Sequence, residues 1–352
     1  MVGGFMAELS GWEKEYIKLR EYISAHAEIV LKKNEISIPQ PLRDEFYRLF
    51  DEVRRAVAAE HLNSLPVKAR TLSEQYARVE KEATGLLGVE KIEMPVDLHI
   101  FLHNPEEGLI RPVYTPLFDM LQGKISEEEF TQLASAHITS FAKELFRLGY
   151  ERWAGLELVK LLEPEEAFFV DLDEDFKPYL CKLETVSFGR QSHHPTMRIP
   201  EFVVRSRRFN TLVAIKMALS VEIDEYYVQF KPPVRPKKRT GDTSFALDSR
   251  VVLLSFLENE KKIPVYADIF ECTRTSPDWL VEYVDGDMLG DPDAFQRVSR
   301  HLEILNPKFG CSLIVLGDAP ELAADMIPEK VNLVVADFDS TRLETALNVL
   351  SA

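Results

Sequence analysis

The residues best suited to chemistry lie around two predicted strands in the C-terminal half of the chain. Val251–Phe256 is a short apolar, β-prone run, and Ile263–Thr273 is a second one, separated from the first by a charged turn. Asp248 lies just before the first run. Glu271 and Thr273 lie near the end of the second run, two residues apart, so they share one face of that strand. A carboxylate from each of two neighbouring strands is one way to bind Mg²⁺, so Asp248 and Glu271 are predicted metal ligands.

This arrangement resembles the core motif of the PD-(D/E)XK nuclease superfamily. In that motif a strand-opening Asp is followed, after a turn, by Glu-x-Lys on the next strand. The matching stretches here are Leu247–Asp248 and Phe270–Thr273, and the resemblance covers roughly residues 205–352. Thr273 stands where the superfamily has the Lys that orients the nucleophilic water and balances charge.

The resemblance also implies a set of functional roles. It implies a restriction-endonuclease-like core, a bound Mg²⁺ ion and cleavage of phosphodiester bonds. A helix and further β/α units are expected after the motif, and the superfamily often carries a Gln on that helix near the site. The catalytic residues that the resemblance implies are Asp248, Glu271, Thr273 and Gln296.

The basic residues of the chain gather in one region. The net charge is −16 at pH 7, which argues against a protein that coats nucleic acid. Residues 186–240 nevertheless contain eleven basic and four acidic residues. This local excess suits phosphate and predicts nucleic-acid contacts by Arg205, Arg207, Arg208, Lys237, Lys238 and Arg239. A solvated linker joined to a charged helix face explains the same residues equally well.

The first 163 residues are predicted to form a mainly helical domain. Within residues 1–90, apolar residues recur at helical spacing in three segments that prolines and glycines separate. Three such helices form either an intramolecular bundle or an arm that packs on a protein partner. Ser126 and Glu129 form a capping box for a further helix, which is expected to stop at Gly149 and to be followed by a shorter helix.

Four segments in the middle of the chain have less regular patterns. Val96–His103 is predicted to be a strand, and its histidines are not assigned a metal role. Glu201–Val221 is predicted to be a helix, and Ser276–Pro292 a loop. Residues 164–240 as a whole are assigned to a connecting α/β segment. That segment contains an exposed basic loop, Lys231–Arg239, whose three prolines prevent regular structure.

The end of the chain alternates between helices and strands. A capped helix over Asp293–Leu305 is followed by two nearly continuous apolar strands, Gly310–Leu316 and Val331–Asp337, and by a closing helix over Thr341–Leu350. This order predicts a partly parallel sheet covered by helices.

The predicted fold class is therefore α/β, or α+β over the whole chain. A helical N-terminal region comes first, and a mixed sheet flanked by helices follows. The restriction-endonuclease-like core is assigned to residues 241–352, with a start near residue 205 as the alternative.

Composition places the protein among soluble globular proteins of two or three domains. The 352 residues are 45% hydrophobic and 28% charged. No apolar run approaches the ~20 residues of a membrane span, and the N-terminus lacks the apolar core of a signal peptide. Cys181, Cys272 and Cys311 share no short spacing and are predicted to be free thiols. A cytoplasmic protein without membrane contact is expected.

Two function classes remain open. The first is a metal-dependent nuclease-like protein that binds or cuts nucleic acid and, if active, is a Mg²⁺-dependent phosphodiesterase. The second is a non-catalytic binding or scaffold protein that contacts a protein partner through its N-terminal helices. The carboxylates and the basic region favour the first class, and the missing Lys favours the second. Neither a glycine-rich phosphate loop nor a nucleophile elbow occurs in the sequence.

Overall fold

The chain divides into two compact units, each described here by itself. Unit 1 comprises Met1–Ala77 and Pro95–Gly149, and unit 2 comprises Arg78–Met94 and Tyr150–Ala352. The predicted domain limits at residues 163 and 240 stay a prediction. None of the described helices is long and apolar enough to cross a membrane. The computed structural model describes residues 11–33, 35–62, 65–187, 197–219, 251–260, 262–268, 275–289, 292–317 and 327–351.

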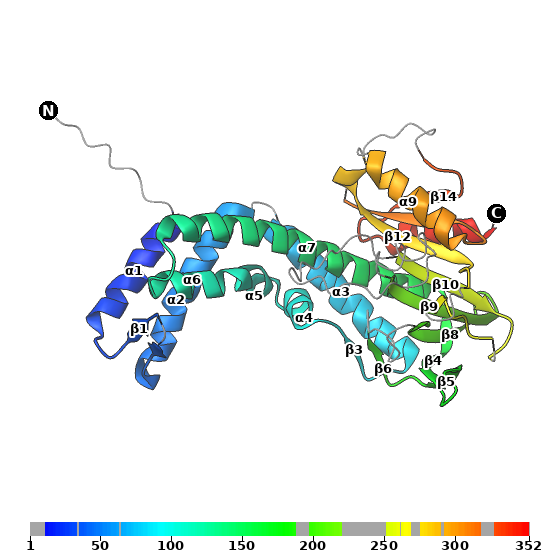
Figure 1. The fold of residues 1–352 in the computed structure, drawn as a ribbon, viewed down its shortest axis with the longest axis horizontal. Coiled ribbons are helices and arrows are strands. Elements are labelled where there is room, and N and C mark those ends of the chain that lie inside the picture. The colour runs from blue at the N-terminus through cyan, green and yellow to red at the C-terminus, as the bar shows by residue number, and fades with distance from the viewer. Residues whose placement is uncertain are drawn as a thin grey trace, which may run out of the picture. The chain divides into compact units, whose positions relative to one another are not determined.

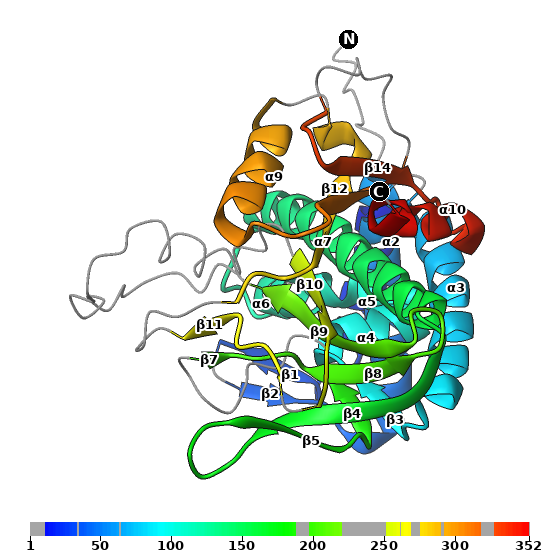
Figure 2. The same cartoon turned by 90° about the vertical axis from the view of Figure 1, so that its right-hand side faces the viewer.

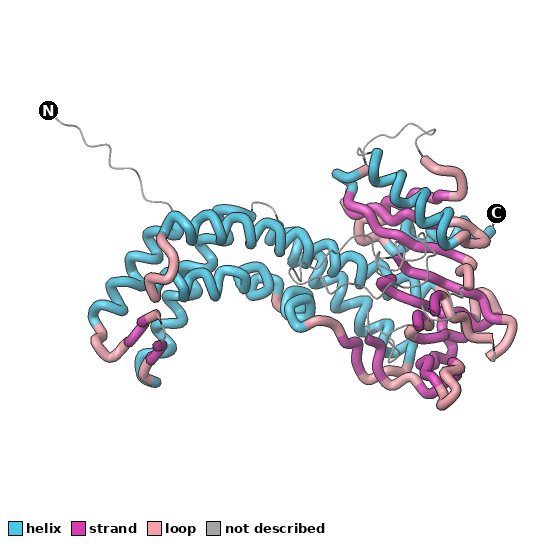
Figure 3. Tube along the Cα trace, in the orientation of Figure 1, coloured by secondary structure: helices cyan, strands magenta, loops and turns pink. Residues whose placement is uncertain are grey.

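Unit 1 is built mainly from helices, as predicted (Figure 1 and Figure 3). The Trp12 and Phe130 rings, 5.1 Å apart between centroids, join its first helix to its last. The division from unit 2 falls inside α3 and α7. The elements are α1 Gly11–Ala25, β1 Val30–Lys32, β2 Glu35–Ser37, α2 Gln40–Leu62, α3 Leu65–Leu87, α4 Val96–His103, α5 Pro105–Ile110, the 3-10 turn η1 Arg111–Val113, α6 Tyr114–Leu121 and α7 Glu127–Leu161.

The segment that forms α4 is a helix, so the strand predicted there is wrong. Leu98, Phe101 and Leu102 are buried at helical spacing on one side of α4. Phe101 packs closely on Gly108 of α5, where an ideal Cβ would lie 2.5 Å from the Phe101 Cα. Packing between α4 and α5 therefore outweighs the local pattern that resembled a strand.

Helix α7 runs through Gly149 instead of ending there. Its predicted capping box forms: the Ser126 N–H donates to Glu129 at 2.8 Å, and the Glu129 N–H donates to the Ser126 hydroxyl at 3.2 Å. An ideal Cβ at Gly149 would lie 2.8 Å from Leu72 and 2.9 Å from Leu102. The glycine allows close packing of helices, and it is not a stop signal.

Unit 2 is organised around an eight-stranded mixed sheet, which confirms the predicted α/β class (Figure 2). The strand order is β14-β13-β12-β10-β9-β8-β4-β5; β12, β13 and β14 are parallel, and the other neighbouring pairs are antiparallel. The strands are β4 Pro164–Leu172, β5 Pro178–Lys182, β8 Phe202–Ser206, β9 Thr211–Leu219, β10 Val251–Leu257, β12 Trp279–Asp285, β13 Cys311–Leu316 and β14 Val331–Val335.

The helices of the C-terminal part follow the predicted order. Helix α9, Pro292–Leu305, connects β12 to the parallel strand β13, and α10, Ser340–Glu344, continues into the 3-10 helix η4, Thr345–Ser351. A further 3-10 turn, η2, covers Gly286–Met288. The predicted strands and closing helix of this region are confirmed, with the last turns of the closing helix wound as 3-10.

The predicted pairing of Val251–Phe256 with Ile263–Thr273 is wrong. Strand β10 pairs with β9 on one side and with β12 on the other. The described part of the second run contributes only β11, Ala267–Asp268, which pairs with β7, Met197–Arg198, in a separate sheet. The loop predicted over Ser276–Pro292 is therefore also wrong: Trp279–Asp285 forms β12, which is buried on both faces and lies between β13 and β10. A two-stranded parallel sheet of β3, Lys91–Glu93, and β6, Thr185–Ser187, completes unit 2.

The predicted helix over Glu201–Val221 is also wrong. This segment forms the hairpin of β8 and β9, with paired residues from Phe202 and Ile215 to Ser206 and Thr211. Asn210 in the connecting turn has a φ of 49°, a left-handed conformation that Asn adopts more readily than most residues. β-Branched residues in both strands, among them Val203, Val204 and Val213, favour the hairpin over a helix.

Different helices cover the two faces of the sheet. One face presents Leu253, Leu280 and Leu313 to the apolar side of α9. On the opposite face lies the C-terminal part of α7: the Tyr150 hydroxyl donates to the Val315 carbonyl at 3.2 Å. Both faces are therefore dry, and any charged side chain that points from the central strands must find its partner inside the protein.

Candidate functional site

Most of the predicted catalytic residues lie outside the described residues. These are Asp248, Glu271 and Thr273, and the same holds for Lys237, Lys238 and Arg239 of the predicted basic loop. The Mg²⁺ site therefore stays a prediction. Gln296 is described, and its side chain is exposed on α9. The neighbouring residue Arg297 reaches the sheet, where its Nε donates to Glu282 of β12.

The three described arginines of the predicted phosphate surface all contact carboxylates. Arg205 meets Glu166 at 2.7 Å and Glu260 at 3.2 Å. The other two pairs are Arg207 with Glu163 and Arg208 with Glu344, each at 2.8 Å. The charges of these three arginines are therefore balanced in space by acids from other segments. Exposed pairs of this kind add little stability.

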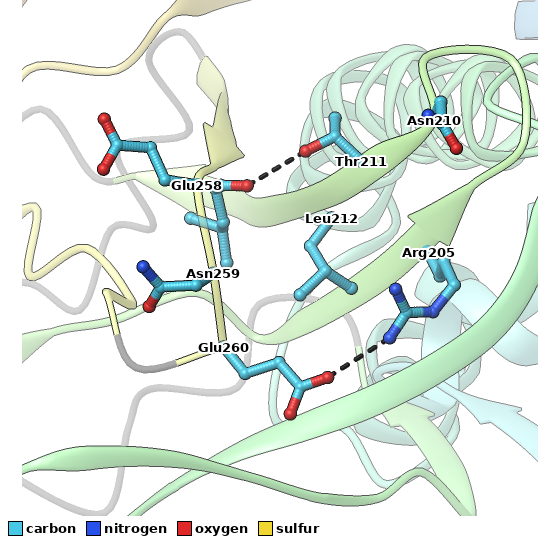
Figure 4. Close-up of a pocket in the computed structure, with 8 residues that line it drawn as sticks. Arg205, Asn210, Thr211, Leu212, Glu258, Asn259 and Glu260 are labelled. Carbon is cyan, nitrogen blue, oxygen red and sulfur yellow. Dashed lines mark hydrogen bonds and ion pairs between the residues drawn. The ribbon is translucent and has the colours of Figure 1, made fainter.

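A shallow hollow of about 620 Å³ lies beside Arg205, where β8 and β10 end and β9 begins. Figure 4 shows the Arg205 guanidinium turned toward Glu260, with Glu258 pointing away from it. The Thr211 hydroxyl donates to the Leu257 carbonyl at 2.9 Å and holds the strand ends together. The lining contains more carboxylates than cations, which disfavours an anionic ligand; it consists of Arg205, Asn210, Thr211, Leu212, Leu257, Glu258, Asn259 and Glu260.

A buried carboxylate connects the sheet to α9. Glu282 is fully buried in the middle of β12. One of its oxygens lies 2.9 Å from Nδ1 of His301, and the other accepts from Nε of Arg297 at 3.3 Å. Burial, with a further contribution from the charge of Glu282, raises the pKa of the Cys311 thiol well above its usual range. Cys311 is therefore a protonated, unreactive thiol at neutral pH.

A second buried ion pair lies where β8 begins. The Glu201 carboxylate accepts from the Lys216 ammonium and from the Met217 N–H, and the Glu201 N–H donates to the Ile215 carbonyl at 2.9 Å. The side chains of Glu201 and Lys216 are only 8% and 5% exposed. Burial raises the pKa of Glu201, while Lys216 opposes that shift. The Glu201 carboxylate thus accepts a backbone hydrogen bond from β9 just before the first residue of β8.

Two buried hydroxyl groups, those of Ser255 and Tyr266, form a polar cluster with the Glu201–Lys216 ion pair. The Tyr266 hydroxyl donates to the Ser255 hydroxyl at 3.1 Å. Ser255 pairs with Ala214, which is two residues from Lys216. The side chains of Ser255 and Lys216 therefore project from the same face of the sheet. Burial raises the pKa of Tyr266, and the charge of Glu201 adds to the shift. The cluster is satisfied internally, as a structural polar network should be.

A polar group without such a partner lies on the α7 side of the sheet. Within the described residues, the buried Tyr283 hydroxyl makes no hydrogen bond. It faces Gly155 of α7, where an ideal Cβ would lie 3.7 Å from the hydroxyl and 2.5 Å from the Met217 methyl. Burial raises the pKa of Tyr283, so it stays a neutral phenol.

These buried groups could hold protons, but each carboxylate already meets a cation. Perturbed groups of this kind occur at active sites and in structural ion-pair networks alike. Glu282, His301 and Lys216 were not predicted from the sequence as site residues. One signal was available for Glu282: a lone carboxylate inside the apolar run of β12 requires a buried cationic partner.

Comparison of the chain with known proteins gives no relative from which the site could be interpreted. No family model, no curated protein and no solved structure matches this chain. Among the described residues, no group of three or more His, Cys, Asp or Glu side chains is arranged to hold a metal ion.

Proposed function

We propose that this is a non-catalytic binding protein that contacts a protein partner through unit 1. One observation carries the proposal: two tyrosines, Tyr47 of α2 and Tyr114 of α6, are 37% and 40% exposed above a layer of phenylalanine rings. Tyr47 lies 5.3 Å from Phe46, and Tyr114 lies 5.2 Å from Phe50 and 5.1 Å from Phe118, measured between ring centroids. We call Tyr47 and Tyr114 the aromatic surface.

The Tyr114 ring of the aromatic surface is held in place by the buried side chain of Arg54. The Arg54 guanidinium lies 5.4 Å from the centre of the Tyr114 ring. Its nitrogens donate to Asp51 at 2.6 Å, to Glu107 at 2.9 Å and to the Ile110 carbonyl at 3.3 Å. Rings that are already ordered lose little conformational entropy when a partner binds.

Tyrosine, the residue type of this surface, is common at protein interfaces. Tyrosine and arginine are enriched where proteins meet, because a rigid ring offers apolar area together with a polar tip. In unit 2, the ion pairs of Arg205, Arg207 and Arg208 make phosphate a less suitable ligand. Both observations favour the binding class over the nuclease class.

The test uses the full chain as bait in an extract of its source cells, with bound proteins quantified by mass spectrometry. The variant Tyr47→Ser/Tyr114→Ser should lose one or more partners that the wild type retains. The control Tyr179→Ser alters a tyrosine of unit 2 that is 44% exposed and should keep them. Identical partner sets for the wild type and the double variant, with circular dichroism unchanged, would exclude the aromatic surface as an interface.

The second candidate is the nuclease-like protein with Mg²⁺. The observation that favours it is the chain order in unit 2: strand β12 is followed by helix α9 and by the parallel strands β13 and β14, as the resemblance implies. The catalytic ligands would be Asp248 and Glu271. Because a shared fold does not imply a shared function, this order supports the candidate only by analogy.

Cleavage assays on single- and double-stranded DNA and RNA test the second candidate directly. We expect weak Mg²⁺ binding and slow or absent cleavage by the wild type, since Thr273 cannot supply a cation beside the water. Thr273→Lys should then raise the rate, and Glu271→Ala in that background should abolish it. An absence of Mg²⁺ binding and cleavage in all three proteins would eliminate the nuclease class.

A further inference from the structure

A shallow hollow of about 640 Å³ lies along one face of helix α3, in the part of α3 that belongs to unit 2. Its lining residues recur at intervals of three and four, as on a single helix face, and all of them are exposed. On the opposite side of α3, Val79 and Ala83 are fully buried, so packing holds the helix in place. The lining residues, which we call the α3 surface, are Arg78, Lys81, Glu82, Gly85 and Leu86.

The C-terminal end of the α3 surface is apolar and has room for a neighbour. The Leu86 side chain is 47% exposed. A Cβ built on Gly85 would have no packing neighbour within 4 Å among the described residues. Glycine lowers the stability of a helix relative to alanine, and no described neighbour requires its small size here. Because helix axes approach to about 8 Å only where the side chains between them are small, Gly85 suits an incoming helix.

The N-terminal end of the α3 surface carries positive charge. Lys160 of α7 forms ion pairs with Glu82 and, at 3.0 Å, with Glu157. The hydrogen bond from Lys160 lowers the pKa of Glu82, with a smaller contribution from the charge of Arg78, so Glu82 is ionised and already paired. Lys81 forms no ion pair with any described residue. The surface therefore presents an uncompensated positive charge on a chain whose net charge is −16.

We propose that the α3 surface docks an acidic amphipathic helix of a protein partner. The surface lies in unit 2, so this contact is distinct from the aromatic surface of unit 1. An apolar side chain of the partner would pack against Leu86 and over Gly85, and a carboxylate would pair with Lys81. Helix recognition of this kind uses apolar anchors at helical spacing, and complementary charges around the anchors select the partner.

The spacing of the α3 surface predicts the spacing of the partner's residues. Lys81 lies five residues before Leu86, which is about 7.5 Å along the helix axis, and Arg78 lies eight residues before Leu86, which is about 12 Å. A partner helix that lies along α3 would therefore carry one carboxylate about one turn from its apolar anchor. A second carboxylate would follow about two turns from the anchor.

The test uses a defined probe, a helical peptide of about 20 residues in an alanine-rich host, which is long enough to be helical in water. Leucines lie along one face of the peptide, with glutamates one and two turns from them. A second peptide replaces each glutamate by lysine. Fluorescence anisotropy measures the binding of both labelled peptides to the untagged full chain. Non-specific attraction to this acidic chain favours the lysine peptide, so a preference for the glutamate peptide indicates a local positive site.

Three variants locate the binding of the glutamate peptide. Lys81→Glu should weaken it by at least about tenfold, because a like-charge contact replaces an ion pair. Lys68→Glu is the matched control: it makes the same charge change at an exposed position of α3 outside the hollow, and it should keep the wild-type affinity. Gly85→Leu should weaken binding by a similar factor, because its side chain occupies the hollow. Leucine favours helix more than glycine does, so circular dichroism should show intact helices.

A charge swap distinguishes a docked helix from diffuse electrostatic attraction. The lysine peptide should bind Lys81→Glu more tightly than Lys68→Glu, although the two variants have the same net charge. The proposal is overturned if the wild type binds the glutamate peptide no better than the lysine peptide, or if Lys68→Glu loses as much affinity for the glutamate peptide as Lys81→Glu does. Sedimentation velocity that shows a dimer lost in Gly85→Leu would assign the α3 surface to a second copy of the chain and would also overturn it.

Discussion

The buried ion pair of Glu201 and Lys216 gives a sharp test of the unit 2 core. Replacing Lys216 by Met keeps a long side chain in place, while the Glu201 carboxylate retains only the Met217 N–H of the two donors that contact it. The pair is almost fully buried, with side chains 8% and 5% exposed. Removing one partner of such a pair costs about 3–5 kcal/mol, because an uncompensated charge remains in a low-dielectric site.

Protonation of Glu201 sets an upper limit on that cost. Burial already raises its pKa above 4.5, and without Lys216 the carboxyl can take up a proton instead of staying charged. At pH 7, protonating a carboxyl of ordinary pKa 4.5 costs about 3.4 kcal/mol, since each pKa unit corresponds to about 1.36 kcal/mol. Lys216→Met should therefore lower the free energy of unfolding by about 3 kcal/mol at pH 7.

The stability that Lys216→Met loses depends on pH. In Lys216→Met, the native state keeps a proton on Glu201 that the unfolded chain releases above its own pKa of 4.5. The folded-state pKa is the higher one, so the stability of the variant relative to the wild type falls as the pH rises. The slope reaches about 1.4 kcal/mol per pH unit, and the deficit closes as the pH approaches the wild-type pKa of Glu201, which burial raises above 4.5.

Urea unfolding followed by tryptophan fluorescence at pH 5, 6 and 7 measures these quantities. Trp153 and Trp279 are fully buried in unit 2, and Trp12 belongs to unit 1, so every protein carries Trp12→Phe. Glu201→Gln/Lys216→Met removes both charges, keeps an acceptor for the backbone N–H, and should recover most of the loss. A deficit below about 1 kcal/mol at pH 7, or one that does not change with pH, would refute a buried charged pair.

Close packing and burial carry three further predictions. Gly108→Ala should destabilise unit 1 by about 1–3 kcal/mol in urea unfolding, because its methyl group meets the α4 backbone, whereas Gly85→Ala in open space should stabilise by up to about 1 kcal/mol; equal signs would contradict this. With the third cysteine replaced by Ala, burial should make Cys311 inert and Cys181 slow toward Ellman's reagent until the protein unfolds, since it raises both pKa values. Tyr283→Phe should change stability by less than about 1 kcal/mol, and a loss above about 2 kcal/mol would reveal a hydrogen bond through ordered water.

The elements that the sequence predicted correctly have a strong local pattern. Cys311–Leu316 and Val331–Val335 are nearly continuous apolar runs, which is the pattern of strands buried on both faces. The helices of residues 11–87 and the capping box at Ser126 follow from apolar spacing and from side chains that reach their own backbone. Each of these signals lies within one segment, so no knowledge of distant neighbours is needed.

The elements that were predicted wrongly depend on distant partners. Strand β12 contains Glu282, and a carboxylate in a buried strand is tolerated only because Arg297 and His301 reach it from α9. Lys216 is one of the basic residues within 186–240, but its side chain is buried in an ion pair with Glu201. The candidate site was therefore the less predictable part, since its geometry depends on contacts between segments that the local pattern does not encode.

The position of Glu282 limits which carboxylates of unit 2 could bind a metal ion. Glu282 is a carboxylate on the strand directly beside β10, the place that the resemblance gives to the motif Glu. Both of its oxygens, however, already contact side chains of α9, and it is fully buried. Glu282 therefore joins strand to helix instead of offering oxygens to an ion. Any Mg²⁺ site of the predicted kind must be built from Asp248 and Glu271 themselves, which makes Glu271→Ala the decisive variant for the nuclease class.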